Sequence, residues 1–180
     1  MVKLYKPYVL TVHTVMLISF FGLFTLAYSD TCPNGLAFMD SYLDNDDICV
    51  PENFSTAVQS QQQAYYFFES VTINGETVAA DDWVGAFSGD VCVGALQWDT
   101  SLCNNGVCAV LVQGYDGNDY SDGYCNIGDI PNYKIFDKSA GIYLSAEPSE
   151  NIPWSNGDFS YIESLSACEE DECGVCGGDN

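Results

Sequence analysis

The stretch Tyr65-Tyr-Phe-Phe-Glu-Ser-Val-Thr-Ile73, followed at once by Asn74-Gly75, decides the fold class of this chain. Aromatic and β-branched residues at this density favour an extended strand. Asn-Gly is a strong hairpin signal, because a type I′ turn needs two residues that tolerate positive φ. A return strand is therefore expected over residues 76–79, and the chain from residue 64 onward is expected to be all-β.

The same pattern recurs further along the chain, where apolar runs flank short polar turns. Hairpin turns are expected at Ser88-Gly89-Asp90, at Cys103-Asn-Asn-Gly-Val-Cys108 and at Lys138-Ser-Ala-Gly141. Further strands are expected at residues 83–87, 91–98, 107–113, 133–137, 142–145 and 159–165. About eight short strands without a sustained helical period predict an antiparallel β-sandwich, jelly-roll or immunoglobulin-like, with a barrel as the alternative.

Residues 1–29 have the three parts of a secretory signal. Lys3 and Lys6 precede an apolar run, and Ala27-Tyr28-Ser29 fits the small-x-small cleavage pattern. The alternative is an uncleaved membrane anchor, because the run is about as long as a spanning helix. Polar residues dilute the run, so cleavage and a secreted, extracellular or cell-surface location are expected.

Three further parts are expected after the signal. Residues 30–60 form a polar N-terminal segment, and residues 61–167 form the β-sandwich domain. Residues 168–180 form a tail rich in Cys, Asp, Glu and Gly, which has too few apolar residues for a core of its own.

The charge balance excludes several classes of function. All 26 acidic residues follow the signal, and only the lysines Lys134 and Lys138 oppose them, so that part of the chain carries a net charge of −24. A nucleic-acid partner is excluded, because no basic face can be built. The one histidine, His13, lies in the signal, and the chain has no arginine. An enzyme is therefore not expected, since little remains to position a substrate or to stabilise developing negative charge.

Nine cysteines in an oxidising compartment favour disulfides. They are Cys32, Cys49, Cys92, Cys103, Cys108, Cys125, Cys168, Cys173 and Cys176. Cys32 is expected to pair with Cys49, and Cys103 with Cys108 across the neck of a hairpin. The odd number leaves one thiol that is free, or paired with another molecule, or paired with residues beyond Asn180.

An acidic loop is the candidate metal site. Asp116, Asp119 and Asp122 are spaced by three among glycines, and Asp129 follows. Such carboxylates suit calcium, a hard cation that takes six to eight oxygen ligands. The alternative is a solvated acidic loop. A second, weaker candidate is the cluster Asp40, Asp44, Asp46 and Asp47, whereas Asp81-Asp82 is expected to cap a turn before the strand that starts at Trp83.

The tryptophans are the candidates for sugar stacking. Trp83 and Trp98 lie in expected strands among valines, so they are expected in the core. Trp154 lies in an expected turn and is the best candidate for an exposed, carbohydrate-binding ring. Asn53, in Asn53-Phe-Ser55, is the one sequon for N-glycosylation.

The stretch Asp81-Asp-Trp-Val-Gly-Ala-Phe-Ser-Gly-Asp-Val-Cys-Val-Gly94 resembles a module repeated in large surface proteins of environmental microbes. That module shares an x-Asn-Gly hairpin, an acidic strand like this one and a Cys-Val-Gly return strand. The tail Cys173-Gly-Val-Cys176-Gly-Gly-Asp-Asn180 is similar to linkers strung between such modules. The resemblance implies a β-sandwich in an extracellular, multi-module protein, of which this chain would be a fragment, and it implies no catalytic residue.

The function expected first is a non-enzymatic structural or adhesive module of a surface protein or filament. Its partners would be like subunits or neighbouring modules, and residues 53–63 could add as a strand to a neighbour's sheet edge. The alternative is a calcium-dependent carbohydrate-binding module with glycan partners. A second alternative is a glycoside-active enzyme that uses two carboxylates.

Overall fold

The structure is a computed structural model that describes residues 36–39, 48–54 and 57–168. Over these residues the chain forms ten strands and three short 3-10 helices, without an α-helix. The all-β prediction is therefore confirmed for the described residues. No helix among them is long and apolar enough to cross a membrane. The expected signal and the cluster from Asp40 to Asp47 lie outside the described residues.

Two short strands near the N-terminus were not predicted. Strand β1 (Leu36–Met39) pairs antiparallel with β2 (Ile48–Pro51), and the 3-10 helix η1 (Glu52–Phe54) follows. Phe54 is buried, and its ring centroid lies 5.8 Å from that of Phe87 in the main sheet. Ring packing of this kind, and not a local strand signal, holds the segment against the domain.

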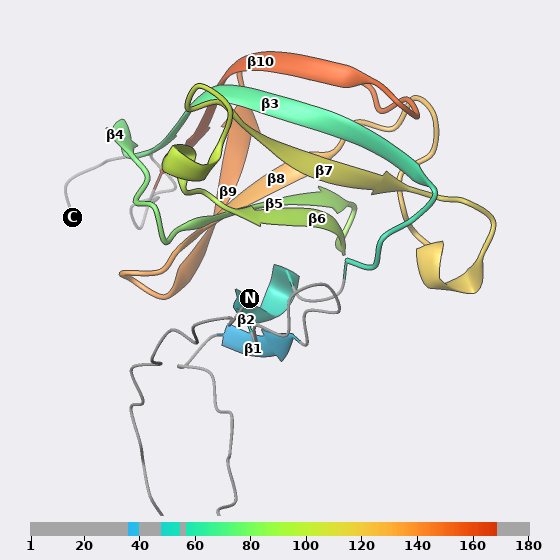
Figure 1. The fold of residues 1–180 in the computed structure, drawn as a ribbon, viewed down its shortest axis with the longest axis horizontal. Coiled ribbons are helices and arrows are strands. Elements are labelled where there is room, and N and C mark those ends of the chain that lie inside the picture. Colours follow the sequence, from blue (N-terminus) through green and yellow to red (C-terminus); the bar gives the residue numbers. More distant parts are fainter. Residues whose placement is uncertain (1–35, 40–47, 55–56, 169–180) are drawn as a thin grey trace, which may run out of the picture. The chain divides into compact units, whose positions relative to one another are not determined.

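The other eight strands belong to one sheet (Figure 1). They are β3 (Gln62–Ile73), β4 (Glu76–Thr77), β5 (Trp83–Ser88), β6 (Val91–Gln97), β7 (Cys108–Gly114), β8 (Asn132–Asp137), β9 (Ile142–Pro148) and β10 (Phe159–Ala167). The helices η2 (Thr100–Leu102) and η3 (Asp119–Ser121) lie in the connections before β7 and β8.

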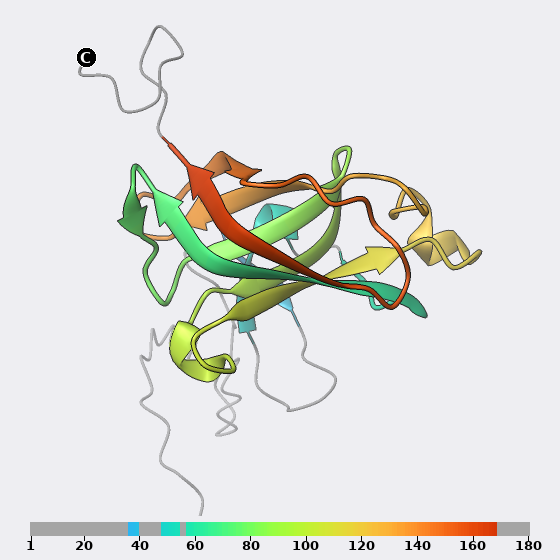
Figure 2. The same cartoon turned by 90° about the horizontal axis from the view of Figure 1, so that it is seen from above.

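The sheet is mixed and curled, so the antiparallel sandwich is not confirmed. The strand order is β4-β3-β10-β9-β8-β5-β6, and β7 pairs with β3 as well. Strand β10 runs parallel to β3, side by side with it in Figure 2, whereas the other pairs are antiparallel. The result is a half-barrel, whose end strands β6 and β7 approach closely. At Gly94 a Cβ atom would lie only 2.1 Å from the carbonyl oxygen of Leu111.

The predicted hairpins are present. Asn74 and Gly75 both have positive φ, 53° and 81°, in the turn between β3 and β4. The return strand is shorter than expected, because β4 contains only Glu76 and Thr77. The predicted Cys103–Cys108 disulfide closes the hairpin before β7.

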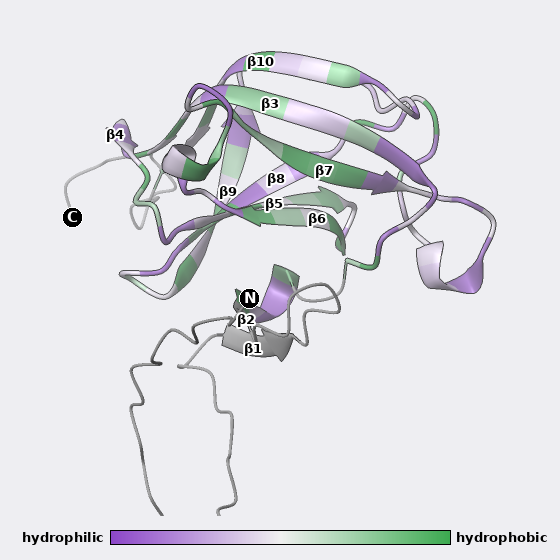
Figure 3. Cartoon of the chain, in the orientation of Figure 1, coloured by the Kyte–Doolittle hydropathy of each residue, from purple (hydrophilic) through white to green (hydrophobic). Residues whose placement is uncertain are grey.

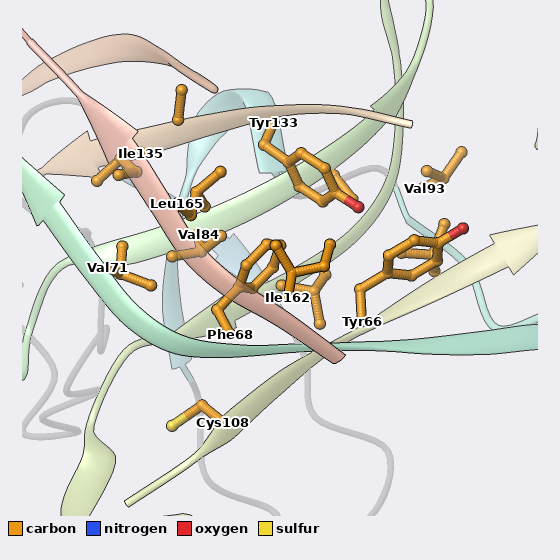
Figure 4. Packing of buried hydrophobic residues seen from close by; sticks show 14 of the residues in the cluster. Tyr66, Phe68, Val71, Val84, Val93, Cys108, Tyr133, Ile135, Ile162 and Leu165 are labelled. Atoms are coloured by element: carbon orange, nitrogen blue, oxygen red, sulfur yellow. The ribbon is translucent and has the colours of Figure 1, made fainter. Parts of the chain in front are cut away.

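The core fills the concave side of the sheet (Figure 4). Buried residues of β3 and β10 point into it, among them Tyr66, Phe68, Ile162 and Leu165, each at most 2% exposed; they alternate with outer residues up to Phe68 and Ile162 and shift by one position beyond them. Figure 3 shows hydrophobic residues gathered along β5, β6 and β7, while polar and apolar residues vary along β3 and β10. The residues between the buried positions of β3 and β10 therefore face away from this core.

Candidate functional site

The outward-facing residues of β3 and β10 include four aromatic rings, Tyr65, Phe67, Phe159 and Tyr161, which we call the aromatic face. The register sets Phe159 opposite Tyr65 and Tyr161 opposite Phe67. Because successive side chains of a strand point to opposite faces, positions two apart share a face. The parallel register therefore builds two ring pairs, one behind the other, on the outer face of the sheet.

The rings of each pair stack. The centroids of Tyr65 and Phe159 lie 5.0 Å apart with an interplanar angle of 9°, and those of Phe67 and Tyr161 lie 4.6 Å apart at 11°. The start of β10 is fixed to β3 by backbone hydrogen bonds, in which Tyr65 N–H donates to the Asp158 carbonyl. The backbone that carries Phe159 is thus fixed beside Tyr65.

These rings are open to solvent. Phe159 is 61% exposed and Tyr161 is 64% exposed, whereas Tyr65 and Phe67 are half-buried. Strand β7 continues the apolar surface, since its half-buried Leu111 and Ala109 lie opposite Tyr65 and Phe67. An exposed apolar patch of adjoining side chains on a soluble domain marks an interaction surface more often than a single exposed residue does.

Among the described residues, no strand pairs with the first part of β10 on the flank away from β3. Strand β9 pairs with β10 only from Leu165 to Ala167, so no described strand pairs with Phe159 or Tyr161 on the side away from β3. An extended molecule can therefore approach along β10 and reach the rings from their free side.

The acidic loop does not gather its predicted metal ligands. Asp116 accepts hydrogen bonds from the Ser121 hydroxyl at 2.8 Å, from the Asn118 backbone N–H at 3.1 Å, and from the Tyr120 hydroxyl. The Tyr120 hydrogen bond holds the pKa of the Asp116 carboxyl well below its ordinary value. Asp129 instead accepts from the Asn126 backbone N–H at 2.7 Å.

Within the part of the chain that the structure describes, no three acidic, histidine or cysteine side chains come together as metal ligands. The structure thus does not unite Asp116, Asp119, Asp122 and Asp129, and calcium binding at this loop stays a prediction. Asp82 has the predicted capping role, because its buried carboxylate accepts from the Ala79 backbone N–H at 2.7 Å.

The prediction that Trp154 is an exposed, sugar-stacking ring is wrong. The residue is 2% exposed, and its Nε1–H donates to the Val112 carbonyl at 3.1 Å. Gly114 provides the space, since a Cβ atom there would lie 2.2 Å from the indole ring. Trp83 and Trp98 are buried as predicted. The exposed aromatic residues are tyrosines and phenylalanines, on strands and not in the turn.

Two predicted disulfide cysteines carry free thiols. Cys92 and Cys125 are both buried and are free cysteines among the described residues, and they lie in separate hydrophobic clusters, so they do not pair with each other. Burial raises the pKa of both thiols, that of Cys125 to about 11, which keeps them protonated and unreactive at neutral pH. Cys168 is disulfide-bonded. Cys32, Cys173, Cys176 and the side chain of Cys49 lie outside the described residues.

The segment predicted as a donor arm is docked on its own domain where the structure describes it. The Val58 backbone N–H donates to the Tyr124 hydroxyl at 2.7 Å, and the Ser60 N–H donates to the Gln113 side chain at 2.8 Å. Asn53 is exposed, as a glycosylation site requires, although the next residue, Phe54, is buried.

Comparison with models of known protein families, with curated proteins and with solved structures finds no match to this chain. The resemblance to a surface-protein module therefore stays a prediction.

The aromatic face was not among the sites predicted from the sequence. The signal that could have found it is the presence of aromatic residues at both alternating positions of one strand. Tyr66 and Phe68 serve the core, but Tyr65 and Phe67 lie between them. A strand that is aromatic on both faces predicts that its outer face is also covered or used for contact.

Proposed function

We propose that this chain is a non-enzymatic extracellular module, structural or adhesive, that makes its contacts through the aromatic face. The observation that carries the proposal is the pair of stacked rings on β3 and β10, whose outer members are more than half exposed. Aromatic residues are enriched at the centres of protein contacts, because they bury a large area at a low cost in conformational entropy.

The extracellular location rests on the signal-like leader and on the disulfides, which persist in oxidising compartments. A contact through the aromatic face replaces the expected donor arm, since Val58 and Ser60 already hydrogen-bond to their own domain. An adhesive role also fits the acidic residues of the described region. Asp82 and Asp116 accept hydrogen bonds that stabilise local turns, and the described residues include no histidine or arginine.

The test is adhesion of the full oxidised chain to a phenyl-bearing surface, measured with a quartz crystal microbalance. We expect the double substitution Phe159→Ser and Tyr161→Ser to reduce adhesion at least tenfold, since the loss of two exposed anchor residues costs more than about 1.4 kcal/mol. The matched control is Leu102→Ser, which removes an 84% exposed apolar side chain outside the aromatic face. Equal losses in both variants would show general hydrophobic adsorption and would refute the proposal.

A further inference from the structure

The charges around the aromatic face indicate the chemistry of its partner, and this inference rests on the proposed function. We propose that the aromatic face binds an extended polypeptide segment that carries lysine or arginine side chains. Such a segment would lie along β10, with its cations between the ring pairs and the carboxylates that follow them.

The carboxylates are those of Glu69 and Glu163, which follow the rings along β3 and β10. The register pairs Phe68 with Ile162 and Ser70 with Ser164 and is interrupted between these pairs, where Glu69 and Glu163 lie on the two neighbouring strands. Both are exposed, and each is two residues beyond an aromatic residue of the face, Phe67 or Tyr161. Like charges on neighbouring strands repel each other, so these two carboxylates bring no benefit to the domain alone.

No lysine of the described residues neutralises this pair. Lys138 lies 3.4 Å from the carboxylate of Asp81, and the Lys134 ammonium lies 4.6 Å from the ring centroid of Phe87. Neither contact involves the aromatic face. Glu69 and Glu163 could therefore bind a cation that comes from another molecule, because the described part of the chain does not supply one.

Three features of the face suit a lysine or arginine side chain together. Aromatic ring faces attract cations, and the gain grows when the cation is partly desolvated. The methylene stem of either side chain packs on apolar surface while its head stays polar. The head then meets Glu69 and Glu163, which can accept charge-assisted hydrogen bonds.

The same charges disfavour the other occupants. A second copy laid on the aromatic face would bring another strongly acidic chain against Glu69, Glu163 and the exposed Asp158, and like-charge contact at an interface costs several kcal/mol. Anionic polysaccharides and anionic membranes are repelled for the same reason. A neutral glycan could stack on the rings, but it would form no ion pair with Glu69 or Glu163.

The test titrates the full oxidised chain with three fluorescent peptides of equal length that alternate threonine with lysine, glutamate or glutamine. Fluorescence anisotropy reports binding at low and at high salt. We expect the lysine peptide alone to bind, with an affinity that falls as salt rises. Glu69→Gln with Glu163→Gln should weaken it about tenfold, and Phe159→Ser with Tyr161→Ser should abolish it.

The matched control is Glu76→Gln with Asp90→Asn, which removes two exposed acidic charges outside the aromatic face. If this control weakens the lysine peptide as much as the Glu69 and Glu163 substitutions do, only the net charge acts and the proposal is overturned. Circular dichroism confirms that all variants remain folded.

Two further outcomes would also overturn it. One is binding of cellohexaose or chitohexaose, and not of the lysine peptide, at the aromatic face. The other is a dimer in sedimentation velocity that Phe159→Ser with Tyr161→Ser dissociates. In both cases adhesion through the aromatic face survives, so the proposed function stands. If the phenyl-surface adhesion is also unchanged by these substitutions, the proposed function itself fails.

Discussion

The inner and outer faces of β3 and β10 use similar residue types in opposite surroundings. On the inner face, Tyr66 and Phe68 are 1% exposed and pack against rings and aliphatic side chains of the half-barrel. On the outer face, Phe159 and Tyr161 are more than 60% exposed. Burial explains the inner rings, because core aromatic residues dominate the stability of small domains. It does not explain the outer rings, which points to a contact and not to folding.

The largest expected effect separates two adjacent phenylalanines. Phe68→Ala should lower the free energy of unfolding by about 3–5 kcal/mol, because it leaves a cavity in the core. Phe67→Ala should cost less, about 1–2 kcal/mol, since its half-buried ring loses contacts with Tyr161, Phe159 and Tyr65 but leaves no core cavity. Urea unfolding followed by circular dichroism measures both. Equal losses would mean that the outer face is as important to stability as the core, and the comparison between the faces would break down.

A smaller effect is expected where the two ends of the sheet meet. Gly94→Ala adds a Cβ atom that would collide with the Leu111 backbone carbonyl, so a strand must shift, at a cost of about 1–3 kcal/mol. Ala109→Val adds carbons on the outer side of β7 and should change stability by less than about 0.5 kcal/mol. Thermal unfolding of the two variants tests this contrast. A harmless Gly94→Ala would show that β6 and β7 are free to separate.

The smallest effect concerns a hydroxyl on the inner face. The Tyr133 hydroxyl is buried and makes no hydrogen bond within the described residues. Tyr133→Phe should therefore leave stability at neutral pH unchanged or raise it by up to about 1 kcal/mol. A clear loss of stability at neutral pH would show that the hydroxyl has a partner, such as a buried water.

The same hydroxyl predicts an alkaline effect. Burial, as the main cause, raises the pKa of both Tyr133 and Tyr66 above the ordinary value for tyrosine. Below about pH 10 both phenols are protonated in the folded and the unfolded state, and above it the unfolded state ionises first. The free energy of unfolding therefore falls as the pH rises above about 10. Tyr133→Phe should make the loss less steep in urea unfolding, and an unchanged slope would exclude Tyr133 as a cause.

Local sequence signals were sufficient for the hairpins and insufficient for the pairing of distant strands. Asn74-Gly75 and the Cys103–Cys108 neck each specify a turn from neighbouring residues alone. The parallel pairing of β3 with β10 has no such local signal, because it joins the first and the last strand of the main sheet. The predicted antiparallel sandwich failed at this point.

The site was harder to predict for the same reason. A tryptophan in a turn suggests exposure, but Gly114 makes room for Trp154 in the core, and that glycine lies on another strand. Conversely, Tyr65 and Phe67 indicate an aromatic outer side of β3, but the ring pairs with Phe159 and Tyr161 exist only because the register places the two strands together. A site that depends on the pairing of distant strands can be located from the structure but not from the local sequence.

The partnership of β3 with β10 also has a consequence for the order of events during synthesis. Strand β3 leaves the ribosome before the other strands of the main sheet, and its neighbour β10 leaves after all of them. Contacts between segments far apart in the sequence form slowly, and unpaired strand edges are prone to aggregate. The nascent chain must therefore carry Tyr65 and Phe67 without their partners Phe159 and Tyr161 until β10 has emerged, so this apolar surface is unpaired for most of the domain's synthesis.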